Sequence, residues 1–134
     1  MAFVLDASIT ASWFLPDERD PRAVKAFALL KTADAHAPVL WWFELRNLLI
    51  VNERRGRIDQ TQTQRTLSIL AALPIELDHS PNEANILTLA RRHGLTIYDA
   101  AYLELAQRLG LPVATLDRAL AKAVVAEGLA LVEA

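Results

Sequence analysis

The fold is decided by the stretch Phe3-Val4-Leu5-Asp6-Ala7-Ser8 near the start of the chain. Its three apolar residues predict a short buried strand, and residues 9–15 after it have a helical composition. A strand that ends at Asp6 and is followed by a helix places the Asp6 carboxylate at the carboxyl edge of a sheet. In open α/β sheets that edge is where ligands bind. We therefore ask which other acids meet Asp6 there.

Length and composition favour a single domain spanning residues 1–134. The absence of cysteine fits a reducing compartment and excludes disulfides and thiolate chemistry. We expect a cytoplasmic protein, because Asp6 interrupts the apolar start and no apolar run reaches the ~20 residues of a membrane helix. The formal net charge of -2 argues against a generally basic nucleic-acid-binding surface.

Short strands alternate with helices along the rest of the chain. We expect further strands at residues 35–38, 75–77, 112–115 and 129–132, and a turn at residues 16–21. Helices are expected at residues 22–31, 39–55, 60–72, 100–109 and 117–126, and from Ser80 or Asn82 to Arg92. Because no hairpin signals separate the strands, the alternation predicts a parallel sheet covered by helices on both faces.

Four acids occupy corresponding places in this pattern. Asp6 and Asp117 follow strands, Asp99 opens a helix, and Glu44 lies early in a helix that is otherwise apolar. Burial of an unpaired Glu44 would cost several kcal/mol or force the carboxyl group to be neutral. A bound cation removes that difficulty.

Carboxylates alone are enough to hold a hard divalent cation such as Mg²⁺ or Mn²⁺. Crowded acids raise one another's pKa until a cation restores the ionised form. Such a site can ionise a water for attack on a phosphodiester and stabilise the leaving oxygen. Ser8 and Thr115 each lie two residues from a site acid, so their hydroxyls are placed to orient carboxylates or waters.

Helix capping explains part of the same pattern without any chemistry. Asp6, Asp99 and Asp117 each stand at the start of an expected helix, where an acid is an ordinary cap worth ~1 kcal/mol. Taken singly, each of the three is more readily a cap than a catalytic residue. Capping explains Glu44 least well, so the set of four indicates a site.

Four segments of the chain resemble the acidic motifs of PIN-domain ribonucleases. They are Val4-Leu5-Asp6-Ala7-Ser8, Phe43-Glu44-Leu45-Arg46-Asn47, Tyr98-Asp99-Ala100-Ala101-Tyr102 with Leu105-Ala106, and Ala114-Thr115-Leu116-Asp117. The length and the segment Ser12-Trp13-Phe14-Leu15-Pro16 resemble the VapC toxins of bacterial toxin–antitoxin pairs.

The resemblance implies a fold, an activity and partners. The implied fold is a single PIN-like α/β domain with a five-stranded parallel sheet in order 3-2-1-4-5, flanked by helices. The implied activity is Mg²⁺- or Mn²⁺-dependent endoribonuclease cleavage of cellular RNA, tRNA or rRNA, by a metal-activated water. The implied partners are a second copy in a homodimer and a cognate VapB-like antitoxin. Carried over by position, Asp6, Glu44, Asp99 and Asp117 are the catalytic and metal-binding acids, supported by Ser8 and Thr115.

Basic and aromatic residues are candidates for contacts with partners. Arg46 and Arg118 lie close in sequence to Glu44 and Asp117, so we predict that they contact the RNA backbone. Large aromatic residues belong either to the core or to an apolar groove for an antitoxin helix or a second copy. They are Trp13, Phe14, Trp41 and Trp42.

Two other functions stay open. A receiver-like or phosphatase-like domain would use Asp6 as a phosphoryl acceptor, but no second acid flanks Asp6 and no lysine follows a late strand. A catalytically inactive module with the PIN fold would only bind protein or RNA. The complete set of acids argues against this second alternative, and failure to bind Mn²⁺ would favour it.

Overall fold

The computed structural model describes residues 2–16 and 19–133. Its centre is a four-stranded sheet in the order β3-β2-β1-β4. The strands are β1 (Phe3–Leu5), β2 (Ala35–Pro38), β3 (Ile75–Asp78) and β4 (Val113–Ala114). All neighbouring strands pair in parallel, so their carboxyl ends lie at the same edge. The predicted parallel α/β class is confirmed.

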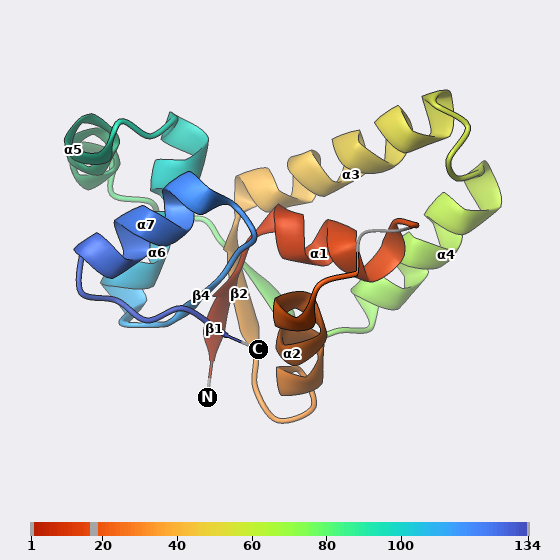
Figure 1. Cartoon of the computed structure of the whole chain (residues 1–134), viewed down its shortest axis with the longest axis horizontal. Helices are drawn as coiled ribbons and strands as arrows, with labels where there is room; N and C mark the ends of the chain where they lie inside the picture. Colours follow the sequence, from red (N-terminus) through yellow and green to blue (C-terminus); the bar gives the residue numbers. More distant parts are fainter. Residues whose placement is uncertain (1, 17–18, 134) are drawn as a thin grey trace.

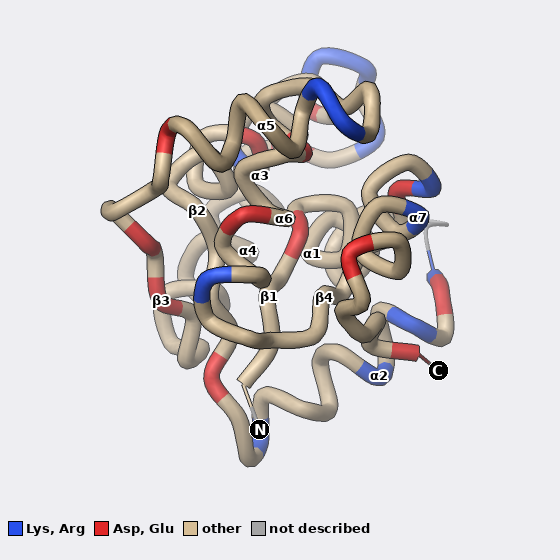
Figure 2. The backbone as a smooth tube through the Cα atoms, turned by 90° about the vertical axis from the view of Figure 1, so that its left-hand side faces the viewer, with Lys and Arg blue, Asp and Glu red and all other residues tan. Residues whose placement is uncertain are grey.

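Seven helices are formed by the described residues. They are α1 (Ala7–Phe14), α2 (Pro21–Leu29), α3 (Val39–Arg54), α4 (Gln60–Ala71), α5 (Glu83–His93), α6 (Ile97–Leu109) and α7 (Arg118–Ala126). Figure 1 shows α1 to α4 on one side of the sheet and α5 to α7 on the other. No helix within residues 2–16 and 19–133 has the length and apolar character needed to cross a membrane. Figure 2 shows several Lys and Arg segments close together at the top of the view, and Asp and Glu segments spread over the rest of the backbone.

The core is built around β1 and α6. Phe3, Val4 and Leu5 are fully buried because β1 lies in the middle of the sheet with helices on both faces. Residues 100–106 of α6 are all buried, because this helix contacts β1, β2, α5 and α7. Asp6 directly follows β1, and Asp99 is the third residue of α6.

The expected fifth strand at residues 129–132 is not formed, and a single parallel bridge joins Val113 to Leu131. Val113 makes both supporting hydrogen bonds: its N–H donates to the Ala130 carbonyl at 3.0 Å, and its carbonyl accepts from the Val132 N–H at 2.8 Å. Because β4 has only two residues, it offers too short a ladder for more pairing. The turn expected at residues 16–21 includes residues 17 and 18, which lie outside the described residues.

The second strand lies inside the sheet although it ends in a proline. β2 pairs with both β1 and β3. The sheet tolerates Pro38 because it is the last residue of β2, and α3 begins at the next residue. The carboxyl end of β2 therefore leads directly into the helix that carries Glu44.

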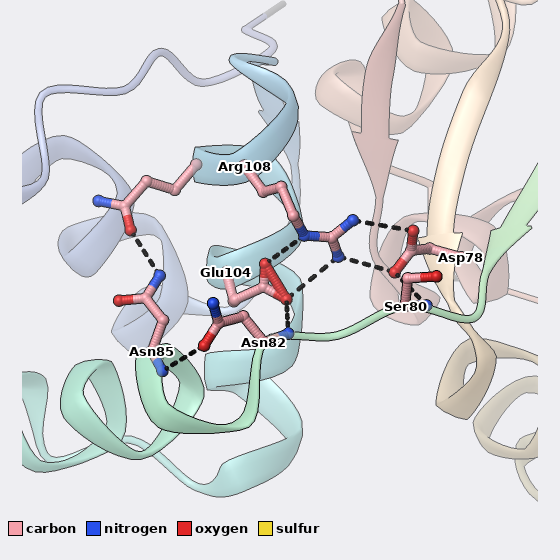
Figure 3. A network of polar contacts seen from close by, with 7 residues as sticks. Asp78, Ser80, Asn82, Asn85, Glu104 and Arg108 are labelled. Atoms are coloured by element: carbon pink, nitrogen blue, oxygen red, sulfur yellow. Dashed lines mark hydrogen bonds and ion pairs between the residues drawn. The ribbon is translucent and has the colours of Figure 1, made fainter.

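A charged network fixes α6 to the connection between β3 and α5 (Figure 3). Arg108 donates two hydrogen bonds to Asp78, at 3.0 and 2.7 Å, and two to Glu104, at 2.8 and 3.1 Å. Glu104 Oε1 also accepts from the Asn82 N–H at 3.0 Å. The Glu104 side chain is only 1% exposed, so these bonds replace the water that the carboxylate loses on folding. The network holds the helix that carries Asp99 in place.

Candidate active site

Four acids from separate parts of the chain line one hollow at the carboxyl edge of the sheet. Its volume is about 450 Å³, and it also has Ser8 and Asn47 in its wall. The acids are Asp6 after β1, Glu44 in α3, Asp99 in α6 and Asp117 after β4. The structure therefore brings together all four acids selected from the sequence.

Asp6 is buried, and two hydroxyl groups solvate it. Its Oδ2 accepts from the Thr115 hydroxyl at 2.6 Å and from the Ser8 hydroxyl at 2.9 Å. Each hydroxyl oxygen in turn accepts a backbone N–H at 3.0 Å, from Leu116 for Ser8 and from Asp117 for Thr115. Because the hydroxyl oxygens are engaged in this way, their protons point to Asp6. Burial raises the pKa of Asp6, and these hydrogen bonds oppose the rise.

Glu44 is half-buried and pairs with a residue that the acidic pattern did not single out. The hydroxyl of Tyr102 donates to Glu44 Oε1 at 2.7 Å. Burial raises the pKa of Glu44, the tyrosine hydrogen bond lowers it, and the negative charges of Asp6 and Asp99 raise it further. The helical spacing of apolar residues predicts that Tyr102 lies on the apolar face of its helix, and it does not predict a contact with Glu44. The available signal was its spacing of three residues from Asp99, which puts both side chains on the same face of α6.

Asp99 is the third acid of the hollow whose pKa is raised. Burial, followed by the negative charges of Asp117 and Asp6, raises its pKa to about 6. The pKa values of Asp6, Glu44 and Asp99 are thus all raised, in each case first by burial. The hollow therefore opposes full ionisation of its own acids unless positive charge enters it.

Capping accounts for only one of the acids. Asp117 caps α7, since its Oδ1 accepts from the Leu120 N–H at 2.9 Å. Asp6 occupies the cap position of α1, but its side chain makes no capping hydrogen bond. Asp99 lies inside α6, where Thr96 is the cap and accepts from the Asp99 N–H at 3.1 Å. Asp99 lies in the first turn of α6, where the helix dipole favours an acid, so Asp6 is the one whose position needs another explanation.

The two arginines expected to contact RNA lie outside the lining of the hollow. The Arg46 guanidinium lies over the Trp42 ring, 3.8 Å from its centroid, and donates to the Trp42 carbonyl at 3.1 Å. Two residues along a helix differ in direction by about 200°, so Arg46 leaves α3 on a different side from Glu44. Arg118 is exposed in the first position of α7.

The aromatic residues divide between the core and the surface. Trp41 is buried and donates to the Thr10 hydroxyl at 3.0 Å, whereas Trp42 is 41% exposed. Trp13 and Phe14 are half-buried and contribute to a groove of about 310 Å³. Further apolar residues in its wall come from α2 and α4 and are Val24, Phe27 and Ile69.

The donor atoms of the acid hollow fit a hard cation. Its titratable lining residues are all carboxylates, with neither His nor Cys among them. Within the described part of the chain, no three His, Asp or Glu residues are grouped closely enough to form a complete metal site. Mg²⁺ commonly takes one or two carboxylates and completes its shell with water and substrate phosphate, so this looser arrangement suits it.

Comparison with known proteins decides the family. The PIN domain model matches residues 3–125. The chain belongs to the PIN domain family. This PIN domain is 35% identical over 128 residues to "Ribonuclease VapC3" of Pyrobaculum aerophilum, covering 91% of this chain and 94% of that protein. The family resemblance drawn from the four acidic motifs is confirmed.

Solved structures agree with the PIN fold. PAE2754 from Pyrobaculum aerophilum superposes with a TM-score of 0.71 at 25% identity, covering 92% of this chain and 84% of that one. VapC20 of Mycobacterium tuberculosis, described as a "Sarcin-Ricin loop cleaving toxin", gives a TM-score of 0.67 at 16% identity, covering 98% and 99%. At that identity the second likeness supports the fold alone.

Asp99→Asn is expected to stabilise the metal-free protein above about pH 6. The folded-state pKa of about 6 exceeds the ordinary 3.8, so the folded protein retains a proton that the unfolded chain releases. The free energy of unfolding therefore falls as the pH rises from 3.8 to about 6. Solvent screens the half-buried carboxylate, so we expect a gain of about 1 kcal/mol or less, roughly 4 °C in Tm.

Thermal unfolding in EDTA at about pH 5 and about pH 8 measures this effect. The matched control is Asp34→Asn, which removes the same charge from an exposed position. If Asp99→Asn and Asp34→Asn raise the Tm at about pH 8 by the same amount, the electrostatic explanation is contradicted.

Proposed function

We propose that this PIN domain is a VapC-type toxin, a metal-dependent endoribonuclease that cleaves cellular RNA at the acid hollow. The observation that carries the proposal is the meeting of Asp6, Glu44, Asp99 and Asp117 around one hollow at the sheet edge. The family adds support, because a relative 35% identical over most of its length is named a ribonuclease. The RNA substrate is proposed to be a tRNA or an rRNA.

The proposed cofactor is Mg²⁺ or Mn²⁺, held by Asp6, Glu44, Asp99 and Asp117 directly or through water. When bound, a divalent cation supplies a Lewis acid that lowers the pKa of a water and stabilises a leaving phosphate oxygen. Positive charge in the hollow also lowers the raised pKa values of the acids, so that they ionise together.

The protein's own contribution to the reaction is to hold these carboxylates in place. Ser8 and Thr115 fix the Asp6 carboxylate through two hydroxyl protons whose directions are set by backbone N–H groups. Preorganised ligands of this kind need no rearrangement when the substrate arrives. A cation held by these acids would let the RNA phosphate approach carboxylates that would otherwise repel it.

We also propose two protein partners. A VapB-like antitoxin would place an amphipathic helix in the groove between α1, α2 and α4, where Val24 is 53% and Phe27 is 41% exposed. The groove also includes Arg19 and Asp20, which offer polar contacts at its rim. The homodimer rests on the family resemblance.

Purified wild-type protein is expected to cut a mixed pool of tRNA and rRNA at discrete positions with Mn²⁺ or Mg²⁺, and to stop in EDTA. Asp6→Asn should lower the cleavage rate by about 100-fold or more, because it removes a charge at the centre of the site. Asparagine keeps an oxygen that can accept from Ser8 and Thr115, so the variant should stay folded. Gel or sequencing analysis of the fragments measures the rates.

Asp34→Asn serves as the control for the loss of one negative charge and should cleave like wild type. Cleavage that persists in EDTA, or that Asp6→Asn leaves unchanged, would contradict the proposed site. A folded protein that neither cuts RNA nor binds Mn²⁺ would favour the inactive binding module.

Arg46 and Arg118 are proposed to contact RNA phosphates. The double variant Arg46→Gln/Arg118→Gln should weaken the binding of single-stranded RNA. The slope of log affinity against log salt should fall by roughly 0.7 for each arginine–phosphate pair that the substitutions remove. Fluorescence anisotropy in EDTA measures binding without cleavage.

The control for this pair is Arg65→Gln/Arg91→Gln, which removes the same charge from exposed faces of α4 and α5. Its salt slope should equal that of wild type. Equal slopes for the two double variants would refute the role of Arg46 and Arg118 in RNA binding.

A further inference from the structure

Tyr102 links two of the helices that carry site acids. It belongs to α6, and its hydroxyl donates to Glu44 Oε1 in α3 at 2.7 Å. The side chain is fully buried. The hydroxyl proton is thus directed to Glu44.

We propose that Tyr102 is a positioning residue, whose hydroxyl holds the Glu44 carboxylate in the orientation that receives the divalent cation. The inference rests on the proposed function, since it concerns the same acid hollow. It adds to that function a residue that touches neither cation nor RNA and acts through Glu44.

The three hydroxyls at the site share one role. Ser8 and Thr115 each donate to Asp6, and Tyr102 donates to Glu44. Burial and the charges of nearby acids raise the pKa of Tyr102, so the phenol stays protonated and is a permanent donor. The site acids are thus oriented by neutral donors that add no charge of their own.

Rigidity explains why Glu44 needs such a partner. A half-buried glutamate has several freely rotating side-chain bonds, and fixing them costs entropy. The tyrosine ring is held by the core on every side, so it offers the carboxylate one fixed point. Removal of a hydrogen bond that orients a metal ligand typically lowers metal affinity by 10–100-fold.

A purely structural role predicts different behaviour. If the hydroxyl only satisfied a buried polar group, its removal would lower stability and leave cation affinity unchanged. If it positions Glu44, its removal lowers cation affinity, and it does so only while Glu44 is a carboxylate. A double-mutant cycle between the two residues separates these cases.

The experiment is calorimetric titration of Mn²⁺ into the full chain, for wild type, Tyr102→Phe, Glu44→Gln and the double variant. Tyr102→Phe should raise the Kd for Mn²⁺ by about 10-fold or more, and should have no further effect in the Glu44→Gln background. Tyr98→Phe is the matched control, because it deletes the same atom from the same helix at a side chain that is 64% exposed. Its Kd should equal that of wild type.

The outcomes discriminate between the possibilities. A wild-type Kd for Tyr102→Phe, or the same decrease in affinity in both Glu44 backgrounds, overturns the positioning role and leaves the proposed function intact. A folded wild-type protein that binds no Mn²⁺ overturns both the positioning role of Tyr102 and the proposed function. If Tyr102→Phe fails to fold, Glu44→Asp replaces it, because the shorter side chain cannot reach both the hydroxyl and the cation. Glu44→Asp should also bind at least about 10-fold more weakly, and unchanged affinity would overturn the role.

Discussion

The burial of one carboxylate, that of Asp6, is the constraint on which the site depends. β1 is a fully buried central strand that ends at Leu5, so the next residue must lie inside the protein at the sheet edge. The carboxylate there is only 6% exposed and has to be solvated by the protein. Ser8 from α1 and Thr115 after β4 supply that solvation. The neighbouring strand β4 and the first turn of α1 are therefore part of the site as much as of the fold.

The same edge gathers more negative charge than it neutralises. Asp99 and Glu44 feel the charge of Asp6 and have raised pKa values, although Tyr102 partly compensates Glu44. Away from this edge, the buried Glu104 is paired with Arg108 and the Asn82 N–H. Crowded acids with raised pKa values are typical of functional sites, and the proposed function gives these four acids such a role. A divalent cation is the partner that the proposed function supplies.

Short sequence patterns were enough to predict many of the strands and helices that position the site. The apolar run before Asp6, Pro21 at the first position of α2 and the Asp59 cap of α4 all follow short-range rules. Long-range contacts could not be inferred in the same way. Tyr102 meets Glu44 across 58 residues, and the absence of a strand at residues 129–132 depends on the shortness of β4. Asp99 is the third residue of its helix and does not cap it, because Thr96 occupies the cap position.

The most direct test of the account is whether cation binding and ionisation of the acids are coupled. Calorimetric titration of Mg²⁺ in two buffers of different ionisation enthalpy gives the number of protons released on binding. Because the pKa of Asp99 is about 6, we expect measurable proton release at about pH 6 and less at about pH 8. Binding at about pH 6 with no proton release, or no binding at either pH, would contradict the claim that the acids form a cation site.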